Sequence, residues 1–269
     1  MKTFQIVRAK THDNFYLPSD FISNLYEQFD SRLVRQYVEG DFVNIESDLA
    51  YYCFDREKNI LPAEMIPAVK SGRVILSFDF NVNPMCAAEI IYDGRTRYQI
   101  AEYKISNSNT RELCELIIDK IFAKYENISE LSFVLTGDAS GNARKSIGES
   151  SDYEIIKRMF DKAGISSFLF VRGTNPPVRE RVNFVNSLME KSQFYISGAC
   201  THSIKDRELV SWKKGSEKFI IDKSDREVSH LSEACDYGLW LSKFMIQEYD
   251  SGMANAFTLG GRREYGFVN

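Results

Sequence analysis

The order of hydrophobic and polar positions divides the chain into a helical opening and a longer series of strands and helices. Residues 19–29, SDFISNLYEQF, place apolar side chains near a 3.6-residue spacing after a Ser/Asp cap, which predicts a helix. Strand patterns follow at 73–82, 84–94 and 97–106, with Asp93-Gly94 as a hairpin turn between the last two. These three segments predict an antiparallel meander.

Helices and strands alternate after the meander. Helical spacing with capping or terminating residues covers 108–126, 150–165, 176–191 and 228–250, and buried strand patterns cover 131–140 and 166–173. The predicted fold class is α/β, with a mixed sheet and helices on both of its faces. Residues 1–59 are expected to form a lead-in segment, and residues 60–269 the main domain.

Composition restricts the class of protein further. The chain has 269 residues, 43% of them hydrophobic, which is enough for one sizeable core. No segment reaches the roughly 18 uninterrupted apolar residues of a membrane span, and the N-terminus lacks the apolar middle region of a secretory signal. The five cysteines form no C-x-x-C pair, so neither a disulfide framework nor a thiolate zinc site is predicted. We therefore expect a protein of a reducing cytoplasm, with no membrane partner.

The charge is unevenly distributed along the chain. The formal net charge is −4, but residues 139–218 contain 14 Lys or Arg against 9 Asp or Glu. A basic face beside an acidic site is one interpretation, and ordinary solvated surface charge is the other.

Two aspartates lie where predicted strands meet loops. Asp79 interrupts the apolar stretch RVILSFDFNVNP, and Asp138 follows the buried run FVLTG. A buried carboxylate is costly without a partner, and if the two strands are neighbours the carboxylates lie roughly 5 Å apart, the usual strand spacing. A hard divalent cation such as Mg²⁺ or Mn²⁺ would hold both. The alternatives are a structural role for Asp79 at a strand end and a turn role for Asp138.

The last predicted helix offers a third ligand. Glu233 lies at the edge of the apolar stripe that should face the sheet, and His230 lies one turn earlier on the same side. Asp236 is expected on the outer side, about 160° from the centre of the stripe. Glu233 is therefore the better candidate, although Asp236 stays open as the alternative. The residues of the stripe are Leu231, Ala234, Tyr237, Gly238, Leu241, Phe244 and Met245.

Four motifs together resemble a known family. In order they are SFDFN at 77–81, LTGDASGNARKS at 135–146, NPPVRERVNFVNSLM at 175–189 and HLSEACDYGLW at 230–240. This order resembles the C-terminal nuclease domain of the large terminase subunit of tailed bacteriophages. The resemblance extends from about residue 20 to 245, because FDSRLVRQYVEGDFVNIESDLAYYCF at 29–54 is similar to the junction between motor and nuclease in that family.

The resemblance implies a ribonuclease H-like fold and a nuclease that cuts concatemeric double-stranded viral DNA during genome packaging. It implies two Mg²⁺ or Mn²⁺ ions, with Asp79, Asp138 and Glu233 as ligands. His230 and Asp236 would tune the attacking water or the outer shell. The family more often has aspartate at the position of Glu233, and here Asp236 is an additional acid.

Phosphate contacts are expected from the positively charged part of the chain. The candidates are Arg144, Lys145, Arg172, Arg179, Arg181, Lys205 and Arg207. Ordinary surface solubility is the alternative reading for each of them.

The resemblance also implies partners and a location. The family's motor contains a phosphate-binding Walker loop, which ends in Gly-Lys-Ser or Gly-Lys-Thr. The residue directly before Lys145 is arginine and not glycine, so the chain is expected to be a nuclease part separated from its motor. The implied partners are that ATPase motor, the small terminase subunit and the portal protein, in the host cytoplasm. Two other readings stay open: another ribonuclease H-like nuclease, such as a resolvase or transposase core, and a non-enzymatic DNA- or portal-binding module.

Overall fold

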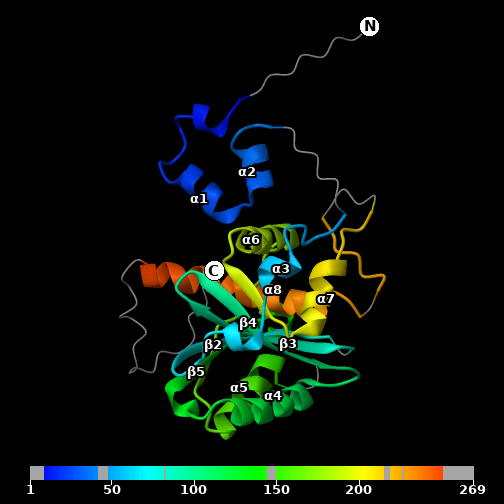
Figure 1. Ribbon diagram of the computed structural model, residues 1–269. Helices are drawn as coiled ribbons and strands as arrows, with labels where there is room; N and C mark the ends of the chain where they lie inside the picture. The colour runs from blue at the N-terminus through cyan, green and yellow to red at the C-terminus, as the bar shows by residue number, and fades with distance from the viewer. Residues whose placement is uncertain are drawn as a thin grey trace.

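A mixed sheet with helices on both faces forms the body of the molecule (Figure 1). The computed structural model describes residues 9–41, 48–81, 83–143, 150–214, 219–225 and 227–250. The strands are β1 (Ile60–Leu61), β2 (Gly72–Asp79), β3 (Met85–Asp93), β4 (Thr96–Ile105), β5 (Leu131–Gly137), β6 (Ser167–Leu169) and β7 (Phe194–Ser197). The helices are α1 (Phe21–Gln28), α2 (Ser31–Tyr37), α3 (Arg56–Asn59), α4 (Thr110–Lys124), α5 (Asp152–Lys162), α6 (Val178–Glu190), α7 (Thr201–Leu209) and α8 (His230–Asp250).

The strand order is β1-β7-β4-β3-β2-β5-β6. The pairs β2–β3 and β3–β4 are antiparallel, which confirms the predicted meander, and the pairs β2–β5, β5–β6, β4–β7 and β1–β7 are parallel. Gly94 has a φ of +55° in the turn between β3 and β4, where a glycine is expected. The predicted α/β class with a mixed sheet is therefore confirmed.

Each face of the sheet has its own hydrophobic core. Helices α4 and α5 cover one face, and α8 covers the other with α6 and α7 lying against it (Figure 1). Strand β2 lies inside the sheet between β3 and β5, and its last six residues are buried. The helix predicted at the C-terminal end is confirmed as α8, but β7 and α7 were missed. Strand β7 has four residues, too few for a periodic pattern to be recognised.

The segment before residue 60 is in contact with the main domain. Glu190 of α6 accepts a hydrogen bond from the backbone nitrogen of Ser31, and Lys191 at the end of α6 donates to the backbone carbonyl of Phe29. Ala50 and Tyr51 are buried in the core formed by α6, α7 and α8. The division at residue 59 stays a prediction. Among the described residues, no helix is both long and apolar enough to cross a bilayer.

Gly137 allows β5 to approach β2 closely at the end where Asp138 emerges. Its φ is +139°, and a Cβ built on it would lie 2.1 Å from the carbonyl oxygen of Phe78. The backbone nitrogen of Asp138 donates to that same carbonyl over 2.9 Å. A side chain at 137 would therefore separate the two strands where Asp79 and Asp138 lie side by side.

We predict that Gly137→Ala lowers the free energy of unfolding by about 3 kcal/mol, because an unfavourable φ and a backbone clash are combined. The matched control is Gly164→Ala. Gly164 also has a positive φ, +72°, but its Cβ would have nothing within 4 Å, so a loss of only about 1 kcal/mol is expected. Urea unfolding of both variants measures the difference, and equal losses would contradict the close approach.

Candidate metal centre

Asp79 is the last residue of β2 and is 4% exposed. In the parallel pairing of β2 with β5, Phe78 is opposite Gly137, so Asp79 and Asp138 follow on neighbouring strands. The expectation that these two strands are neighbours is confirmed. Both aspartates lie at the carboxyl ends of parallel strands, where functional groups of α/β proteins often gather.

The carboxylate of Asp138 also shapes its own loop. Its Oδ1 accepts hydrogen bonds from the backbone nitrogen of Ser140 at 2.8 Å and from Nδ2 of Asn175 at 2.7 Å. The first of these caps the short 3-10 helix Ala139–Asn142. Asp138 is only partly buried, so it keeps access to solvent at the edge of the site.

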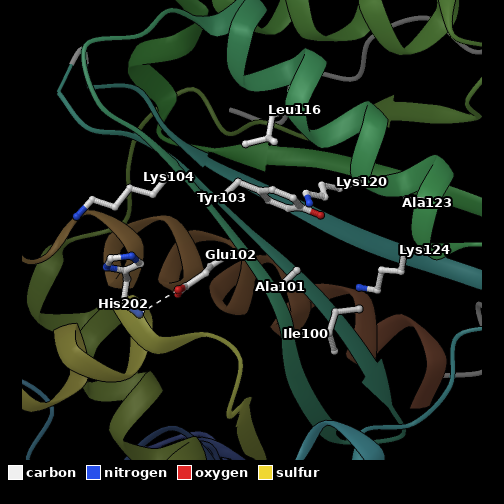
Figure 2. A pocket seen from close by; sticks show the side chains of 10 residues that line it. All are labelled: Ile100, Ala101, Glu102, Tyr103, Lys104, Leu116, Lys120, Ala123, Lys124 and His202. Atoms are coloured by element: carbon white, nitrogen blue, oxygen red, sulfur yellow. Dashed lines mark hydrogen bonds between the residues drawn. The ribbon is translucent and has the colours of Figure 1, made fainter.

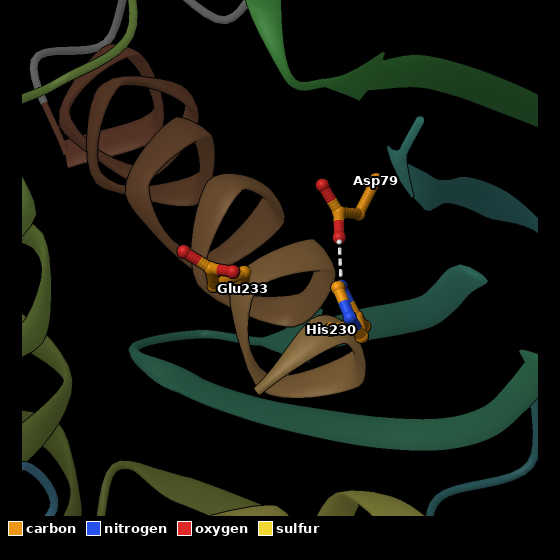
Figure 3. Close-up of side chains that lie close together, drawn as sticks. All are labelled: Asp79, His230 and Glu233. Carbon is orange, nitrogen blue, oxygen red and sulfur yellow. Dashed lines mark hydrogen bonds and ion pairs between the residues drawn. The ribbon is translucent and has the colours of Figure 1, made fainter. Parts of the chain in front are cut away.

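Asp79, His230 and Glu233 converge beside the start of α8 (Figure 3). Each offers one possible ligand atom, and these atoms all lie within 4.8 Å of one another. The Nδ1 atom of His230 is 3.2 Å from Oδ2 of Asp79, and Asn81 donates from Nδ2 to the same oxygen over 2.6 Å. Sequence patterns did not single out Asn81, which lies in a loop just after β2.

Two opposing effects act on Asp79 and His230. Burial raises the pKa of Asp79, while the hydrogen bond from His230 lowers it and the nearby charges of Glu233 and Asp138 raise it again. The pKa of His230 is raised, chiefly by its hydrogen bond to Asp79 and against the effect of burial. The cluster therefore attracts positive charge, and two carboxylates with one imidazole form a donor set that suits Mn²⁺ or Mg²⁺.

The start of α8 is held in place by a neighbouring helix. Asp206 of α7 accepts a hydrogen bond at Oδ2 from the backbone nitrogen of Ser232 over 3.0 Å, which caps the first turn. Ser229, the residue before the helix, has a φ of +88° and is buried. This fixed helix start positions His230 and Glu233 toward β2.

Glu233 has two cationic partners. The Nζ atom of Lys223 is 2.7 Å from Oε2, and Nη2 of Arg181 is 3.5 Å from Oε1. The helical-wheel expectation that Glu233 faces the sheet side agrees with its position in the cluster. Its role as a metal ligand stays a prediction.

The expectation that Asp236 lies on the outer side of the helix is wrong. Asp236 is fully buried, and its carboxylate lies 2.7 Å from Nη1 of Arg207, 3.7 Å from Nε of Arg181 and 2.8 Å from the hydroxyl of Tyr51. A helical wheel assumes that only one face of a helix is buried. Helix α8 packs on the sheet with one face and against α6 and α7 with another, so the side that carries Asp236 is buried as well. Burial raises the pKa of Asp236, and the two guanidinium groups oppose that rise.

Two of the predicted DNA contacts are therefore wrong. Arg181 and Arg207 are 1% and 0% exposed, and their guanidinium groups stack on the rings of Tyr237 and Tyr51. Groups buried in this way cannot reach a phosphate. A count of charges along the chain does not distinguish such internal ion pairs from a basic surface.

The other predicted phosphate contacts stay predictions. Arg172 and Lys205 are exposed, and Arg179 is partly buried with its guanidinium over the ring of Phe219. Arg144 and Lys145 lie outside the described residues.

A groove of about 520 Å³ between β4, α4 and the start of α7 carries cations that sequence patterns did not single out (Figure 2). Lys104, Lys120 and Lys124 line it, together with His202 and the acidic Glu102. Lys104 pairs with Glu227, and Cys86 lies opposite both Lys104 and Asp79 on the two neighbouring strands. Two strand spacings therefore separate Lys104 from Asp79, about 10 Å.

The buried pairing of Asp236 gives a test of its structural role. We predict that Asp236→Asn lowers the free energy of unfolding by about 3 kcal/mol, because the buried Arg207 loses its counter-charge and the buried Arg181 loses one of its two. Asp161→Asn is the control, since Asp161 pairs with Lys157 on the surface of α5 and should contribute less than about 1 kcal/mol. Chemical denaturation measures both variants, and a loss of less than 1 kcal/mol for Asp236→Asn would contradict the ion pairs described above.

Comparison with known proteins gives structural similarity alone. The sequence matches no protein-family model and no curated protein. The large terminase of a thermophilic bacteriophage, solved in complex with ATP-gamma-S, superposes with a TM-score of 0.60 at 15% identity, over 85% of this chain and 53% of that chain. The nuclease domain of the bacteriophage P22 large terminase superposes with a TM-score of 0.53 at 17% identity, over 74% of this chain and 96% of that domain.

This chain thus spans about half the length of the larger terminase, and its similarity covers nearly all of the P22 nuclease domain. The resemblance seen in the sequence motifs is confirmed at the level of the fold. The chain has the fold of the nuclease domain of a phage large terminase.

Proposed function

We propose that this chain is a divalent-metal-dependent endonuclease that cuts concatemeric double-stranded viral DNA during genome packaging. The observation that carries the proposal is the convergence of Asp79, His230 and Glu233 within 4.8 Å, on a fold shared with terminase nuclease domains. Asp138, which directly follows β5 next to the end of β2, would complete the set of acids.

The donor set fits the metals that the proposal requires. Oxygen ligands from three acids suit Mg²⁺ or Mn²⁺, and the imidazole of His230 favours Mn²⁺ more than Mg²⁺. The carboxylate of Glu233 already has positively charged partners, which is consistent with a site that binds cations. Two divalent ions at such a site would activate a water and stabilise the leaving 3′ oxygen of an in-line displacement.

The protein's own residues would have distinct tasks. Asp79, which is buried, would hold the divalent ions together with Asp138 and Glu233. With a hydrogen on Nδ1, His230 would donate to Oδ2 of Asp79 and orient that carboxylate. Asn81 donates to the same oxygen and would restrain it further.

DNA would be held mainly through its phosphates. We assign these contacts to the exposed Arg172 and Lys205 and to Lys104, which lines the groove beside β4 and lies in the same row of the sheet as Asp79. Such contacts position DNA without reading its sequence. The ATPase motor, the small terminase subunit and the portal protein are proposed partners.

The proposal predicts that the purified chain cleaves plasmid DNA with Mg²⁺ or Mn²⁺, without ATP and with little sequence preference.

Asp79→Asn should abolish cleavage while leaving the thermal stability without metal equal or higher, because it removes repulsion among the carboxylates. Glu233→Gln should reduce cleavage at least about 100-fold, as expected for loss of a metal ligand.

Agarose gels with matched Mn²⁺ titrations measure these effects, and the exposed Asp161→Asn variant serves as the control with wild-type activity. Metal-independent cutting, or full activity of Asp79→Asn, would disprove the assignment. A strong preference for branched DNA would favour a resolvase-like enzyme, and DNA binding without metal binding would favour a non-enzymatic module.

A further inference from the structure

The two carboxylate oxygens of Glu233 have cationic partners of different kinds. Oε1 faces Nη2 of Arg181 at 3.5 Å, and Oε2 faces Nζ of Lys223 at 2.7 Å. Ser229 adds a hydroxyl hydrogen bond to Oε2 at 3.3 Å. Both cations neutralise the same charge, but their surroundings give them different freedom to leave it.

Arg181 is fixed in its place. Its side chain is 1% exposed, its Nε lies 3.7 Å from Asp236, and its guanidinium stacks on the ring of Tyr237 at 4.1 Å. Asp236 is itself anchored by Arg207 and by the hydroxyl of Tyr51. A buried guanidinium cannot leave such an arrangement without exposing an uncompensated charge to the core, so Arg181 remains beside Glu233.

Lys223 has the opposite character. Its side chain is 55% exposed, and it belongs to the loop that precedes α8 rather than to a helix or strand. When an exposed ammonium group leaves a carboxylate, water replaces the lost contact, so the ion pair contributes little net free energy. Lys223 can therefore be replaced by another cation at Oε2 with little change in the surrounding structure.

We propose that Arg181 is a permanent positioning residue for Glu233, and that Lys223 is an exchangeable counter-ion that a divalent cation must displace to bind this carboxylate. The inference rests on the proposed role of Glu233 as a metal ligand. It deepens that role, because it assigns to Lys223 the control of how tightly the metal binds.

The proposal gives the two cations opposite effects on metal affinity. Removing Lys223 removes a competitor, so the metal should bind more tightly. Replacing Arg181 by lysine keeps the positive charge but loses the fork that contacts Asp236 and Glu233 together, so the metal should bind more weakly. A general electrostatic effect of nearby positive charge would not separate the two residues in this way.

The test is the affinity for Mn²⁺ alone, measured by isothermal titration calorimetry and by the electron paramagnetic resonance of free Mn²⁺. We expect Lys223→Met to bind Mn²⁺ about fivefold more tightly than the wild type, the scale of an exposed ion pair. Lys223→Arg, which keeps the charge, should stay within about twofold of the wild type. Lys157→Met removes a surface ion pair on α5 and should have no effect.

Arg181→Lys is expected to bind Mn²⁺ about tenfold more weakly, as for loss of a group that orients a metal ligand. Thermal unfolding without metal shows whether this variant is folded. If it is not, the comparison of Lys223→Met with Lys223→Arg decides the proposal by itself.

Equal Mn²⁺ affinity of the wild type and Lys223→Met would overturn the inference, and so would tighter binding by Lys223→Arg. The proposed function would survive either result if Asp79→Asn still abolished Mn²⁺ binding. Absence of Mn²⁺ binding by the wild type and by every variant would overturn both.

Discussion

The structure around α8 depends on the neutralisation of buried negative charge. Asp79, Glu233 and Asp236 are all buried near the first turns of this helix. Carboxylates in such a position are costly unless each has a partner, and the chain supplies one kind of partner for each. Asp79 has His230, Asp236 has buried arginine, and Glu233 has one buried and one exposed cation. Asp79 and Glu233 each keep a small exposed fraction and are the proposed metal ligands, whereas Asp236 is fully buried and has a structural role.

The same interactions connect the opening segment with the site. Tyr51 precedes β1, and its hydroxyl binds Asp236, which in turn lies beside Arg181. Arg181 reaches Glu233 at the edge of the proposed metal centre. Tyr51 and Asp236 are 185 positions apart in the sequence, yet both belong to one group of buried polar and charged side chains. The segment that resembles a motor–nuclease junction is thus in contact with the charges that position Glu233.

Much of the fold followed from local patterns, and much of the charge arrangement did not. Periodicity located the meander, the later helices and the two strand-end aspartates, because burial on one face repeats along the chain. It misplaced Asp236, since a helix covered on two sides has no polar outer face at that position. It also assigned Arg181 and Arg207 to a DNA surface, because net charge carries no information about burial. Asn81 and Lys223 lie in loops, where spacing gives no signal.

We propose that Asp79 and its neighbours form a divalent metal site. A crystal soaked in Mn²⁺ and measured at the manganese absorption edge shows whether they do, because anomalous scattering locates the ions without reference to activity. We expect anomalous peaks in contact with Asp79, one on the side of Asp138 and one on the side of Glu233, with the ammonium of Lys223 withdrawn from Glu233. Full Mn²⁺ exposure with no peak at Asp79, or with peaks only at surface carboxylates, would contradict it.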